Sequence, residues 1–259
     1  MKNKNWVPYP RYLFRKELAL SLIGKYVPKG SKFLEVGCGA GDFGMTLAGM
    51  GYTGVMIDFS EEAVCVTAEN IRIADVQNVQ VQKIDFFDFN SEHRFDLITM
   101  FEVLEHIEKD ADTLQRVNGL LKEGGMFLFS VPSRKKLWGP YDIIAGHIRR
   151  YDKNDITQLT AETGFKTVEL LSYGFPWLNI LKIVRDKMAK KKLRTTTEND
   201  KVLSTKKSGL NLGAVKCRFL ELFFSKWVLF LPMKISNLFN KMDLAEGYLC
   251  LAVKQTANR

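Results

Sequence analysis

The chain has 259 residues, of which 46% are hydrophobic and 26% charged. This length and composition are typical of a soluble globular protein with one α/β domain and an embellishment, rather than two full domains. The cysteines show neither a CxxC pair nor metal-ligand spacing: Cys38, Cys65, Cys217 and Cys250. A disulfide framework and a cysteine metal site are therefore excluded, and no apolar tract is long enough to cross a bilayer.

The formal charge of +9 is concentrated in one segment, since residues 182–207 hold ten Lys or Arg against three acids. A solvated loop is the simplest interpretation, and contact with an anionic membrane is the sharper one. No aromatic-interleaved basic motif accompanies the charge, so we expect no nucleic-acid partner. Residues 1–6 are polar and lack a signal core. We therefore expect a cytoplasmic protein, with peripheral membrane contact as an option.

A helix is predicted first, over 11–27, because its apolar residues have helical spacing and it stops at Pro28 and Gly30. Strand-like and helical segments then alternate. The predicted strands are 32–36, 54–58, 79–83, 95–101 and 126–131, and the predicted helices between them are 42–50, 61–74 and 110–121. We expect Gly124-Gly125 to end the last of these helices. This alternation predicts βαβ units and a parallel sheet with helices on both faces.

The alternation breaks after a helix over 152–163 and a sixth strand over 165–171. About 70 residues then separate the sixth strand from a final strand, over 248–254, that we expect to pair beside it. In this insert we predict a basic helix, a polar stretch, an apolar helix interrupted by Pro232, and a short helix ending at Asn240. The first helix, the polar stretch and the apolar helix cover 177–192, 195–208 and 214–230.

The most informative motif is LEVGCGAGDFG, residues 34–44, an apolar strand that runs into a glycine-rich turn. Glycines let the backbone turn sharply where a side chain would block a ligand. Asp58 ends the next strand, about 20 residues on, where an acid can accept hydrogen bonds from ribose hydroxyls. The pair predicts a nucleoside-bearing cofactor. Because Gly39-x-Gly41-x-x-Gly44 also satisfies the dinucleotide pattern, NAD and FAD stay open.

Further motifs follow at regular intervals: MIDFS, KIDFF, FDLITMFEVLEH and LLKEGGMFLFSVPS. With LEVGCGAG they make the chain resemble the class I S-adenosylmethionine-dependent methyltransferases, in the small-molecule branch that includes ubiquinone-biosynthesis O-methyltransferases. The resemblance covers roughly residues 10–172 and the last strand. It implies a Rossmann-like α/β fold with a seven-stranded, mostly parallel sheet. The domain division expected is a helical cap, the methyltransferase core, a basic and apolar helical insert, and a final strand with tail: 1–30, 31–173, 174–244 and 245–259.

The resemblance also implies a set of cofactor-binding residues around the strand ends. The set comprises Glu35, Gly37, Cys38, Gly39, Gly41, Asp58, Phe59, Asp85, Phe86, Phe101 and Glu102. Within it, Asp58 would bind both ribose hydroxyls and Asp85 the adenine amino group. Either acid alone is more often an ordinary turn residue. Glu35 could instead hold the turn without touching the cofactor, and Cys38 could be only a small residue that fits.

For the reaction, methyl transfer mainly requires holding acceptor and methyl group in line. His147 lies in GHIRRYD, residues 146–152, a segment similar to an H-x-x-R pattern of this branch, and could take a proton from a hydroxyl acceptor. His106 is the second candidate, and His93 is expected to be exposed. Trp138, Tyr141 and Tyr151 could wall an apolar acceptor pocket or merely pack the loop, and Arg150 could orient an acidic acceptor or pair with a local acid. Tyr9 and Tyr12 are further candidates for the acceptor site and, with Trp6, could close over the cofactor or only pack as a helix. No metal site is expected.

These features predict S-adenosylmethionine-dependent methyl transfer to an oxygen atom of a small molecule, with a lipid-like or anionic acceptor as an option. An NAD-dependent oxidoreductase is the rival enzyme, and a non-catalytic cofactor-binding adaptor at a membrane is the rival outside enzymes. Asp85 and FEVLEH have no role in the oxidoreductase. The apolar insert is expected to be a helical cap, a homodimer interface or an interfacial membrane helix.

Overall fold

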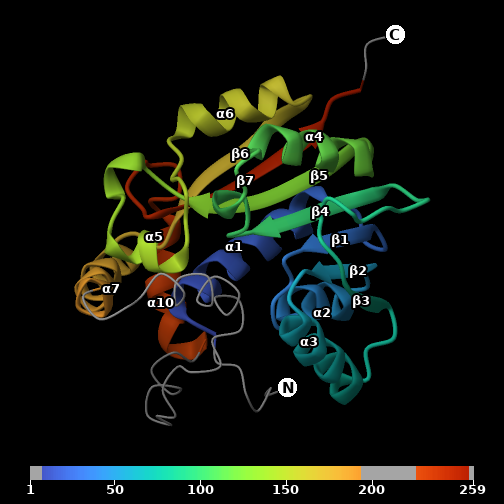
Figure 1. The fold of residues 1–259 in the computed structure, drawn as a ribbon, viewed down its shortest axis with the longest axis horizontal. Helices are drawn as coiled ribbons and strands as arrows, with labels where there is room; N and C mark the ends of the chain where they lie inside the picture. The colour runs from blue at the N-terminus through green and yellow to red at the C-terminus, as the bar shows by residue number, and fades with distance from the viewer. Residues whose placement is uncertain (1–7, 194–225, 257–259) are drawn as a thin grey trace.

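The computed structural model describes residues 8–193 and 226–256 and contains one seven-stranded sheet. The strands are β1 (Lys32–Val36), β2 (Thr53–Asp58), β3 (Val79–Lys83), β4 (Phe95–Phe101), β5 (Leu121–Pro132), β6 (Phe165–Tyr173) and β7 (Gly247–Lys254). Their order is β3-β2-β1-β4-β5-β7-β6, and only β7 runs antiparallel to its neighbours. The predicted fold class, a mostly parallel Rossmann-like sheet, is confirmed (Figure 1).

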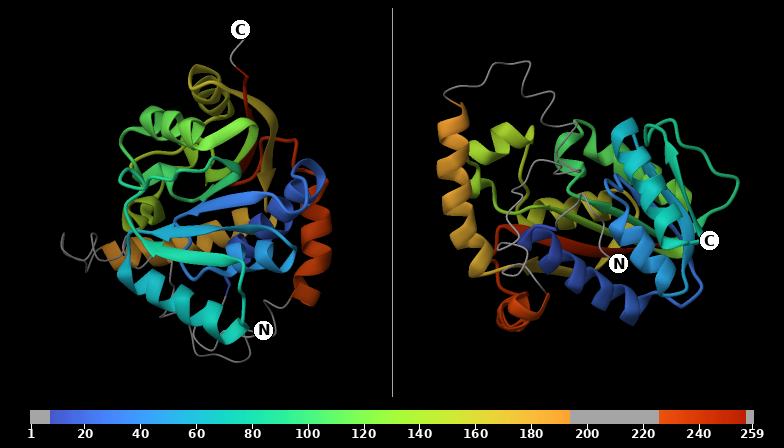
Figure 2. Two further views of the ribbon diagram at one scale, coloured as in Figure 1. Left: turned by 90° about the vertical axis from the view of Figure 1, so that its right-hand side faces the viewer. Right: turned by 90° about the horizontal axis from the view of Figure 1, so that it is seen from below.

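Helices cover both faces of the sheet (Figures 1 and 2). They are α1 (Pro10–Tyr26), α2 (Asp42–Gly49), α3 (Glu61–Ala74), α4 (Asp110–Leu120), α5 (Pro140–Ala145), α6 (Lys153–Glu162), α7 (Trp177–Leu193) and α10 (Lys226–Asn237). Helices α1 and α2 pack on one face of the sheet, while α4 and α6 pack on the other. In β1, Phe33 belongs to the first core and Leu34 to the second. Because successive side chains point to opposite faces, a strand buried on both sides reads as a continuous apolar run.

The end of α4 differs from the prediction. The helix stops at Leu120, and β5 begins at the next residue, so Gly124 and Gly125 do not cap the helix. They lie instead at a shift in the pairing of β4 with β5, between the partners of Phe95 and Leu97. Gly124 has a φ of 71° there. A left-handed residue at an irregularity of a strand pair favours glycine as strongly as a helix end does, which explains the wrong assignment.

The insert is partly described. Helix α7 matches the predicted 177–192, and β7 matches the predicted last strand, which inserts between β5 and β6. Pro232 lies inside α10, so the predicted break there is wrong, and this helix ends at Asn237 rather than Asn240. A proline removes one backbone hydrogen bond but need not end a helix whose flanking residues are packed, as buried Met233 is. The predicted 195–208 stretch and most of 214–230 lie outside the described residues.

The segment between β5 and α6 was expected to be a loop. It contains the short helix α5 and a single 3₁₀ turn, Lys135–Leu137, and a second such turn, Leu104–His106, follows β4. Both segments leave the carboxyl ends of their strands, where parallel α/β sheets bind ligands. Among the described helices, none combines the length and apolar character needed to cross a membrane.

Candidate active site

The glycine turn at the end of β1 is anchored to β2 through its backbone. The amides of Gly37 and Cys38 both donate to the Ile57 carbonyl, at 2.9 and 3.1 Å. Gly37 has a φ of 72°, and a Cβ placed on it would lie 2.5 Å from Cγ2 of Val103. A side chain at this position would therefore meet both backbone strain and a steric clash.

Asp58, at the tip of β2, holds the same turn. Its Oδ2 accepts a hydrogen bond from the Gly39 amide at 3.0 Å, and its Oδ1 accepts one from the Ser60 amide at 2.9 Å. Burial raises the pKa of Asp58, while these two hydrogen bonds act in the opposite direction. The carboxylate thus fixes the turn and stands at the strand end where a ribose would lie.

Two residues of α3 complete this support, and the sequence analysis missed both. The Thr67 hydroxyl donates to the Gly39 carbonyl at 2.8 Å, and the Asn70 side chain donates to the Ala40 carbonyl at 3.0 Å. Both side chains are buried. Polar residues three positions apart on the inward face of the helix after β2 were the available signal. By bonding these carbonyls, they restrict the conformation of the turn.

Glu35 lies in β1 before the turn. It is buried, and its Oε2 has no hydrogen-bond partner. Burial raises the pKa of Glu35 to about 8, against the opposing effect of the Gly44 amide. The carboxyl is therefore largely neutral at pH 7. Its direct contact with a cofactor stays a prediction, as does that of Cys38, which is buried.

The predicted adenine side lies beyond β3. Asp85 Oδ1 accepts a hydrogen bond from the Phe87 amide at 2.8 Å, which orients the carboxylate. The Phe86 ring is buried, whereas the Phe59 side chain is 54% exposed and free to flank a base. Arg116 fixes this loop, because its Nε donates to the Phe86 carbonyl at 2.9 Å. The structure therefore places Asp58, Phe59 and Asp85 at the ends of adjacent strands.

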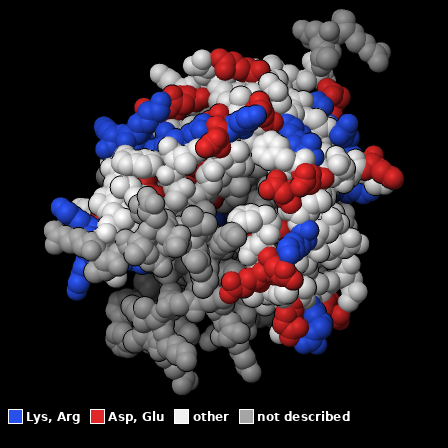
Figure 3. Space-filling view, viewed as in Figure 1, with Lys and Arg blue, Asp and Glu red and all other residues white. Residues whose placement is uncertain are grey.

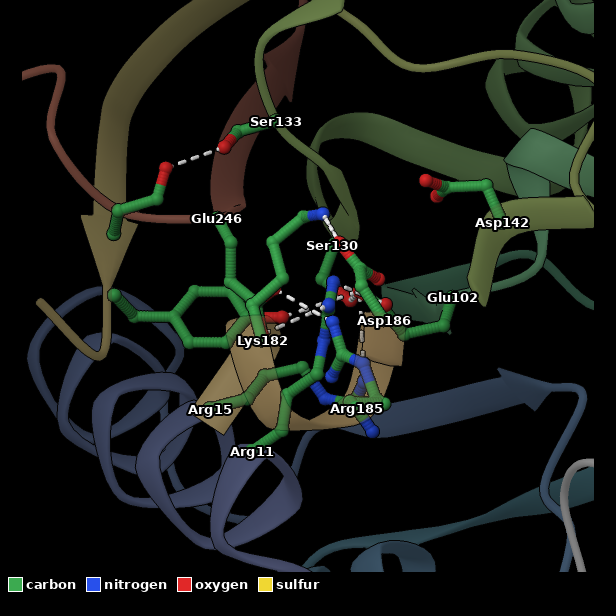
Figure 4. Close-up of polar contacts among 12 residues, drawn as sticks. Arg11, Arg15, Glu102, Ser130, Ser133, Asp142, Lys182, Arg185, Asp186 and Glu246 are labelled. Carbon is green, nitrogen blue, oxygen red and sulfur yellow. Dashed lines mark hydrogen bonds and ion pairs between the residues drawn. The ribbon is translucent and has the colours of Figure 1, made fainter. Parts of the chain in front are cut away.

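Glu102 follows β4 on the predicted methionine side. Its φ of 56° is unusual for a residue other than glycine, and such strain often accompanies function. Glu102 Oε2 lies 2.6 Å from Nη2 of Arg11, and its Oε1 accepts a hydrogen bond from Ser130 Oγ at 2.8 Å (Figure 4). Burial opposes ionisation, but Arg11 and Arg15 outweigh it and hold the pKa of Glu102 at about 2.

A buried ion-pair network extends from Glu102 to the insert. Arg11 of α1 also lies 3.5 Å from Glu246, and Arg185 of α7 lies 2.6 Å from the same carboxylate (Figure 4). Arg11, Arg185 and Glu246 were not predicted as site residues. Charges this widely spaced in sequence carry no local pattern, so only the fold brings them together.

The two predicted histidines meet beside this network. The ring centroids of His106 and His147 are 5.0 Å apart. His147 Nδ1 lies 2.8 Å from Asp142 Oδ1, and its Nε2 lies 3.8 Å from Glu105 Oε1. Burial would raise the pKa of Asp142, but His147 and Arg150 hold it at about 2. The ionised Asp142 therefore favours the tautomer with the proton on Nδ1, which leaves Nε2 as an acceptor.

Arg150 and Tyr151 do not have the predicted role of touching the acceptor directly. Arg150 is only 2% exposed, and its Nε donates to Asp142 Oδ1 at 2.8 Å. Tyr151 is buried and donates to Asp110 Oδ2 at 3.1 Å. A buried guanidinium requires a local carboxylate, and Asp142 supplies it. Both residues therefore support the loop that carries His147.

The remaining predicted acceptor residues separate into two groups. Tyr9 and Trp138 are exposed, and the half-buried Tyr141 ring lies 6.4 Å from His147 and 4.1 Å from the guanidinium carbon of Arg185. These side chains remain candidates for an acceptor wall. Tyr12 instead donates to Asp42 at the start of α2, on the cofactor side. Trp6 lies outside the described residues.

One cluster among the described residues has a composition that suits a metal ion. Glu105, His106 and His147 each offer a ligand atom, with separations of up to 4.8 Å. A tetrahedral Zn²⁺ with bonds of about 2.0–2.2 Å holds its ligand atoms roughly 3.4 Å apart, so this cluster would have to contract. The absence of a metal site stays a prediction, and we interpret the cluster by its proton chemistry.

Comparison with known proteins identifies the family to which this geometry belongs. A family model described as a methyltransferase domain matches residues 9–170, more than half of the chain. The chain therefore belongs to the methyltransferase-domain family, which confirms the class predicted from the motifs, with S-adenosylmethionine as the cofactor of that class.

Individual relatives are similar over parts of the chain. A ubiquinone biosynthesis O-methyltransferase of Glaesserella parasuis serovar 5 is 33% identical over 111 residues, which are 40% of this chain and 47% of that protein. The chain thus matches about half the length of such curated relatives.

Two solved structures share the fold. Phosphoethanolamine N-methyltransferase 2 of Haemonchus contortus has a TM-score of 0.61 at 17% identity, covering 93% of this chain and 53% of that one. N-methyltransferase NodS of Bradyrhizobium japonicum WM9, in complex with S-adenosylhomocysteine, has a TM-score of 0.53 at 22% identity, covering 63% and 80%. At these identities the likeness concerns the fold alone.

Proposed function

We propose that the chain transfers the methyl group of S-adenosylmethionine to an oxygen atom of a small acceptor that is lipid-like or anionic. The observation that carries this proposal is the His147–Asp142 pair at the carboxyl edge of the sheet, on the acceptor side of Glu102. The division of the chain into a helical cap over 1–30, the core over 31–173, the insert over 174–244 and the final strand over 245–259 is part of the proposal.

The cofactor half of the site supports binding of a neutral sugar and base. Asp58 and Asp85 are both oriented by backbone amides, so each presents its free lone pairs without reorganisation. On the sulfonium side, Arg15 lies 5.1 Å from the Phe101 ring centroid and supplies positive charge for an amino-acid carboxylate.

The acceptor half supports transfer to oxygen. A hydroxyl must lose its proton as the new O–CH₃ bond forms and the S–CH₃ bond breaks, and His147 Nε2 would receive that proton. Asp142 then stabilises the imidazolium through Nδ1, as a carboxylate does in other histidine bases. An amine acceptor would need no such base if it arrived unprotonated. S-adenosylmethionine supplies the methyl group, and S-adenosylhomocysteine leaves as the second product.

The character of the acceptor is inferred from the aromatic side chains predicted for its site, of which Tyr141 lies beside His147. Tyr9, Trp138 and Tyr141 offer apolar rings with polar tips, which suit an amphipathic molecule. Arg185, stacked on Tyr141, adds positive charge at the same place. The similar protein of Glaesserella parasuis is a ubiquinone biosynthesis O-methyltransferase, which agrees with methyl transfer to oxygen.

Calorimetric titration with S-adenosylhomocysteine tests the cofactor half. Asp58→Ala removes charged hydrogen bonds to the ribose and also loosens the turn, and we expect the affinity to fall by about one to two orders of magnitude. The exposed Asp88 is the control, since Asp88→Ala leaves the turn intact. Equal affinity of wild type and Asp58→Ala would contradict the assignment.

Two further measurements separate the rivals. Displacement of bound S-adenosylhomocysteine by NADH at comparable concentration would favour the oxidoreductase. Transfer of tritium from methyl-labelled S-adenosylmethionine to an organic extract of cells would establish turnover. Tight S-adenosylhomocysteine binding with no transfer to any extract would favour the non-catalytic adaptor.

A further inference from the structure

Helix α7 has its polar and apolar faces reversed relative to an ordinary surface helix. Its inward face carries charges: Lys182 is buried and pairs with Asp186, and Arg185 pairs with Glu246. Leu178 and Ala189 are also buried on this face. Surface helices usually turn their charged residues to water and their apolar residues inward. The sequence of α7 is amphipathic, but its apolar side faces out.

The outward face is a stripe of large apolar side chains. Its members are between 42% and 69% exposed: Ile180, Leu181, Ile183, Val184 and Met188. Positions 180, 183, 184 and 188 recur at three- and four-residue spacing, so they form one continuous surface along the helix. A contiguous apolar surface of this kind marks an interaction site rather than scattered exposure.

Basic side chains border the stripe. The exposed lysines at its carboxyl-terminal end are Lys187, Lys190, Lys191 and Lys192. The only acid in α7, Asp186, is bonded to Lys182 on the inward side. Basic side chains stand at the edge of the molecule where α7 lies (Figures 1 and 3). The outward surface of this helix is therefore apolar from Ile180 to Val184, and from Lys187 onward exposed lysines share the face with Met188.

We propose that this face of α7 docks on an anionic lipid bilayer, with the helix lying in the plane of the interface. Apolar side chains on one face, a lysine cluster and a half-exposed Trp177 at the other end are the features of an interfacial helix. The lysines complement phosphate headgroups. A second copy of α7 offers them no partner: in a parallel pair they would face the same lysines, and in an antiparallel pair they would face the apolar end, since the only acid of the helix, Asp186, is bonded to Lys182 on the inward side.

Docking in this orientation has a consequence for the site. Arg185 connects the inward face of α7 to Glu246, which also contacts Arg11 beside Glu102 (Figure 4). The proposed membrane-facing helix and the acceptor half of the site are thus joined by ion pairs that meet at the buried Glu246. The guanidinium carbon of Arg185 also lies 4.1 Å from the Tyr141 ring centroid, so the same helix that would contact the bilayer contacts a candidate acceptor residue on its inward side. The docking surface itself does not depend on which atom is methylated.

Co-sedimentation of the full chain with vesicles tests the proposal. The vesicles are phosphatidylcholine alone or phosphatidylcholine with 30% phosphatidylglycerol, a composition chosen for the assay and roughly that of an anionic leaflet. We expect binding to the anionic vesicles, weakened when the salt is raised to about 0.5 M. Ile183→Ser with Met188→Ser should weaken partition by roughly 30- to 100-fold, since each withdrawn side chain accounts for about one order of magnitude. Lys190→Glu with Lys191→Glu should weaken it at least about tenfold.

Ile73→Ser is the matched control, because Ile73 is also an exposed isoleucine but lies on α3. Its vesicle binding should equal that of the wild type, and all variants should keep wild-type affinity for S-adenosylhomocysteine, which shows that they fold. Failure of the wild type to bind anionic vesicles would overturn the proposal. So would unchanged binding of the Ile183/Met188 variant, or a dimer in vesicle-free solution that this variant abolishes. None of these measurements depends on methyl transfer, so their outcomes neither support nor contradict the proposed methyltransferase activity.

Discussion

The two halves of the site are held together by different kinds of interaction. In the cofactor half, the glycine turn is fixed by single hydrogen bonds between its backbone and nearby side chains, Asp58, Thr67 and Asn70. In the acceptor half, buried charges bridge elements far apart in the chain, as Arg11 does with Glu102 and Glu246. The first half recognises a constant ligand with a local motif. The second depends on ion pairs between residues far apart in the sequence.

Two carboxyls show the contrast most clearly. Burial raises the pKa of Glu35 in the cofactor half to about 8, because the opposing effects there are too weak. Glu102 in the acceptor half is half-buried, and desolvation would raise its pKa too, yet Arg11 and Arg15 hold it at about 2. The two carboxyls therefore have opposite charge states, and the difference is the presence of cations from α1 beside Glu102.

The largest expected effect concerns the acceptor half. His147→Asn removes the proposed proton acceptor, and we expect the rate of tritiated methyl transfer to an organic cell extract to fall by roughly 10²- to 10³-fold. The affinity for S-adenosylhomocysteine, measured by calorimetry, should stay within twofold, because His147 touches none of the turn residues. If the transfer rate and the affinity for S-adenosylhomocysteine fell by a comparable factor, His147 would also contribute to cofactor binding.

His93→Asn is the control for this substitution, since His93 is an exposed histidine in the loop before β4. It should keep the wild-type rate. Asp142→Asn should reproduce part of the loss and move the pH dependence of the rate, because Asp142 sets the tautomer of His147. A wild-type rate for His147→Asn would remove this residue from the mechanism.

The two halves of the site also differ in how far their residues could be predicted from the sequence. The strand-turn-helix-strand order places Gly37 and Gly39 beside the end of the next strand, so their partners Ile57 and Asp58 lie only about 20 residues further along the chain. The position of this half was therefore predictable, and so was the class of cofactor. Thr67 and Asn70 were missed because a buried polar pair on a helix looks like any other helical pair until its neighbours are known.

The acceptor half was predictable only in part. His106 and His147 were identified as candidates, and the fold brings their rings together. For Arg150 the sequence left two alternatives, orienting an acidic acceptor or pairing with a local acid, and its partner is a local acid, the buried Asp142. No local spacing connects Arg185 with Glu246, so pairs of this kind come only from tertiary structure.

A second prediction uses the pKa of Glu35. The unfolded carboxyl titrates near 4.5 and the folded one near 8, so between these values the folded state holds a proton that the unfolded state has lost. The free energy of unfolding therefore falls as pH rises through this window. Glu35→Gln has no carboxyl to titrate, so the free energy of unfolding of this variant should not fall in this window. Relative to wild type, it should rise by about 2.5 kcal/mol between pH 5.5 and 7.5. Urea unfolding at the two pH values measures the difference.

Glu102→Gln provides the opposite sign. The folded pKa of Glu102 is about 2, below the unfolded value of 4.5, so its contribution to stability is present above pH 4.5 and is lost as pH falls toward 2. This variant should be less stable than wild type at neutral pH, and the gap should narrow in acid. Glu92→Gln, at an exposed position, should follow wild type throughout. For Glu35, the contradicting outcome is that the free energy of unfolding of Glu35→Gln and of wild type changes with pH in parallel between pH 5.5 and 7.5. That result would show that Glu35 is ionised in the folded protein.

The smallest expected effect tests whether the cofactor half depends on single hydrogen bonds. Thr67→Val keeps the shape of the buried side chain and removes only the hydroxyl that donates to the Gly39 carbonyl. Leaving that carbonyl without its partner should cost about 1 kcal/mol of unfolding free energy and lower the affinity for S-adenosylhomocysteine by about threefold to fivefold. Thr157→Val is the control, because the Thr157 hydroxyl donates to carbonyls of its own helix on an exposed surface. If Thr67→Val has the same unfolding free energy and the same affinity for S-adenosylhomocysteine as this control, the Thr67 hydroxyl does not stabilise the turn. The turn is then held by Asp58 and its glycines without a contribution from α3.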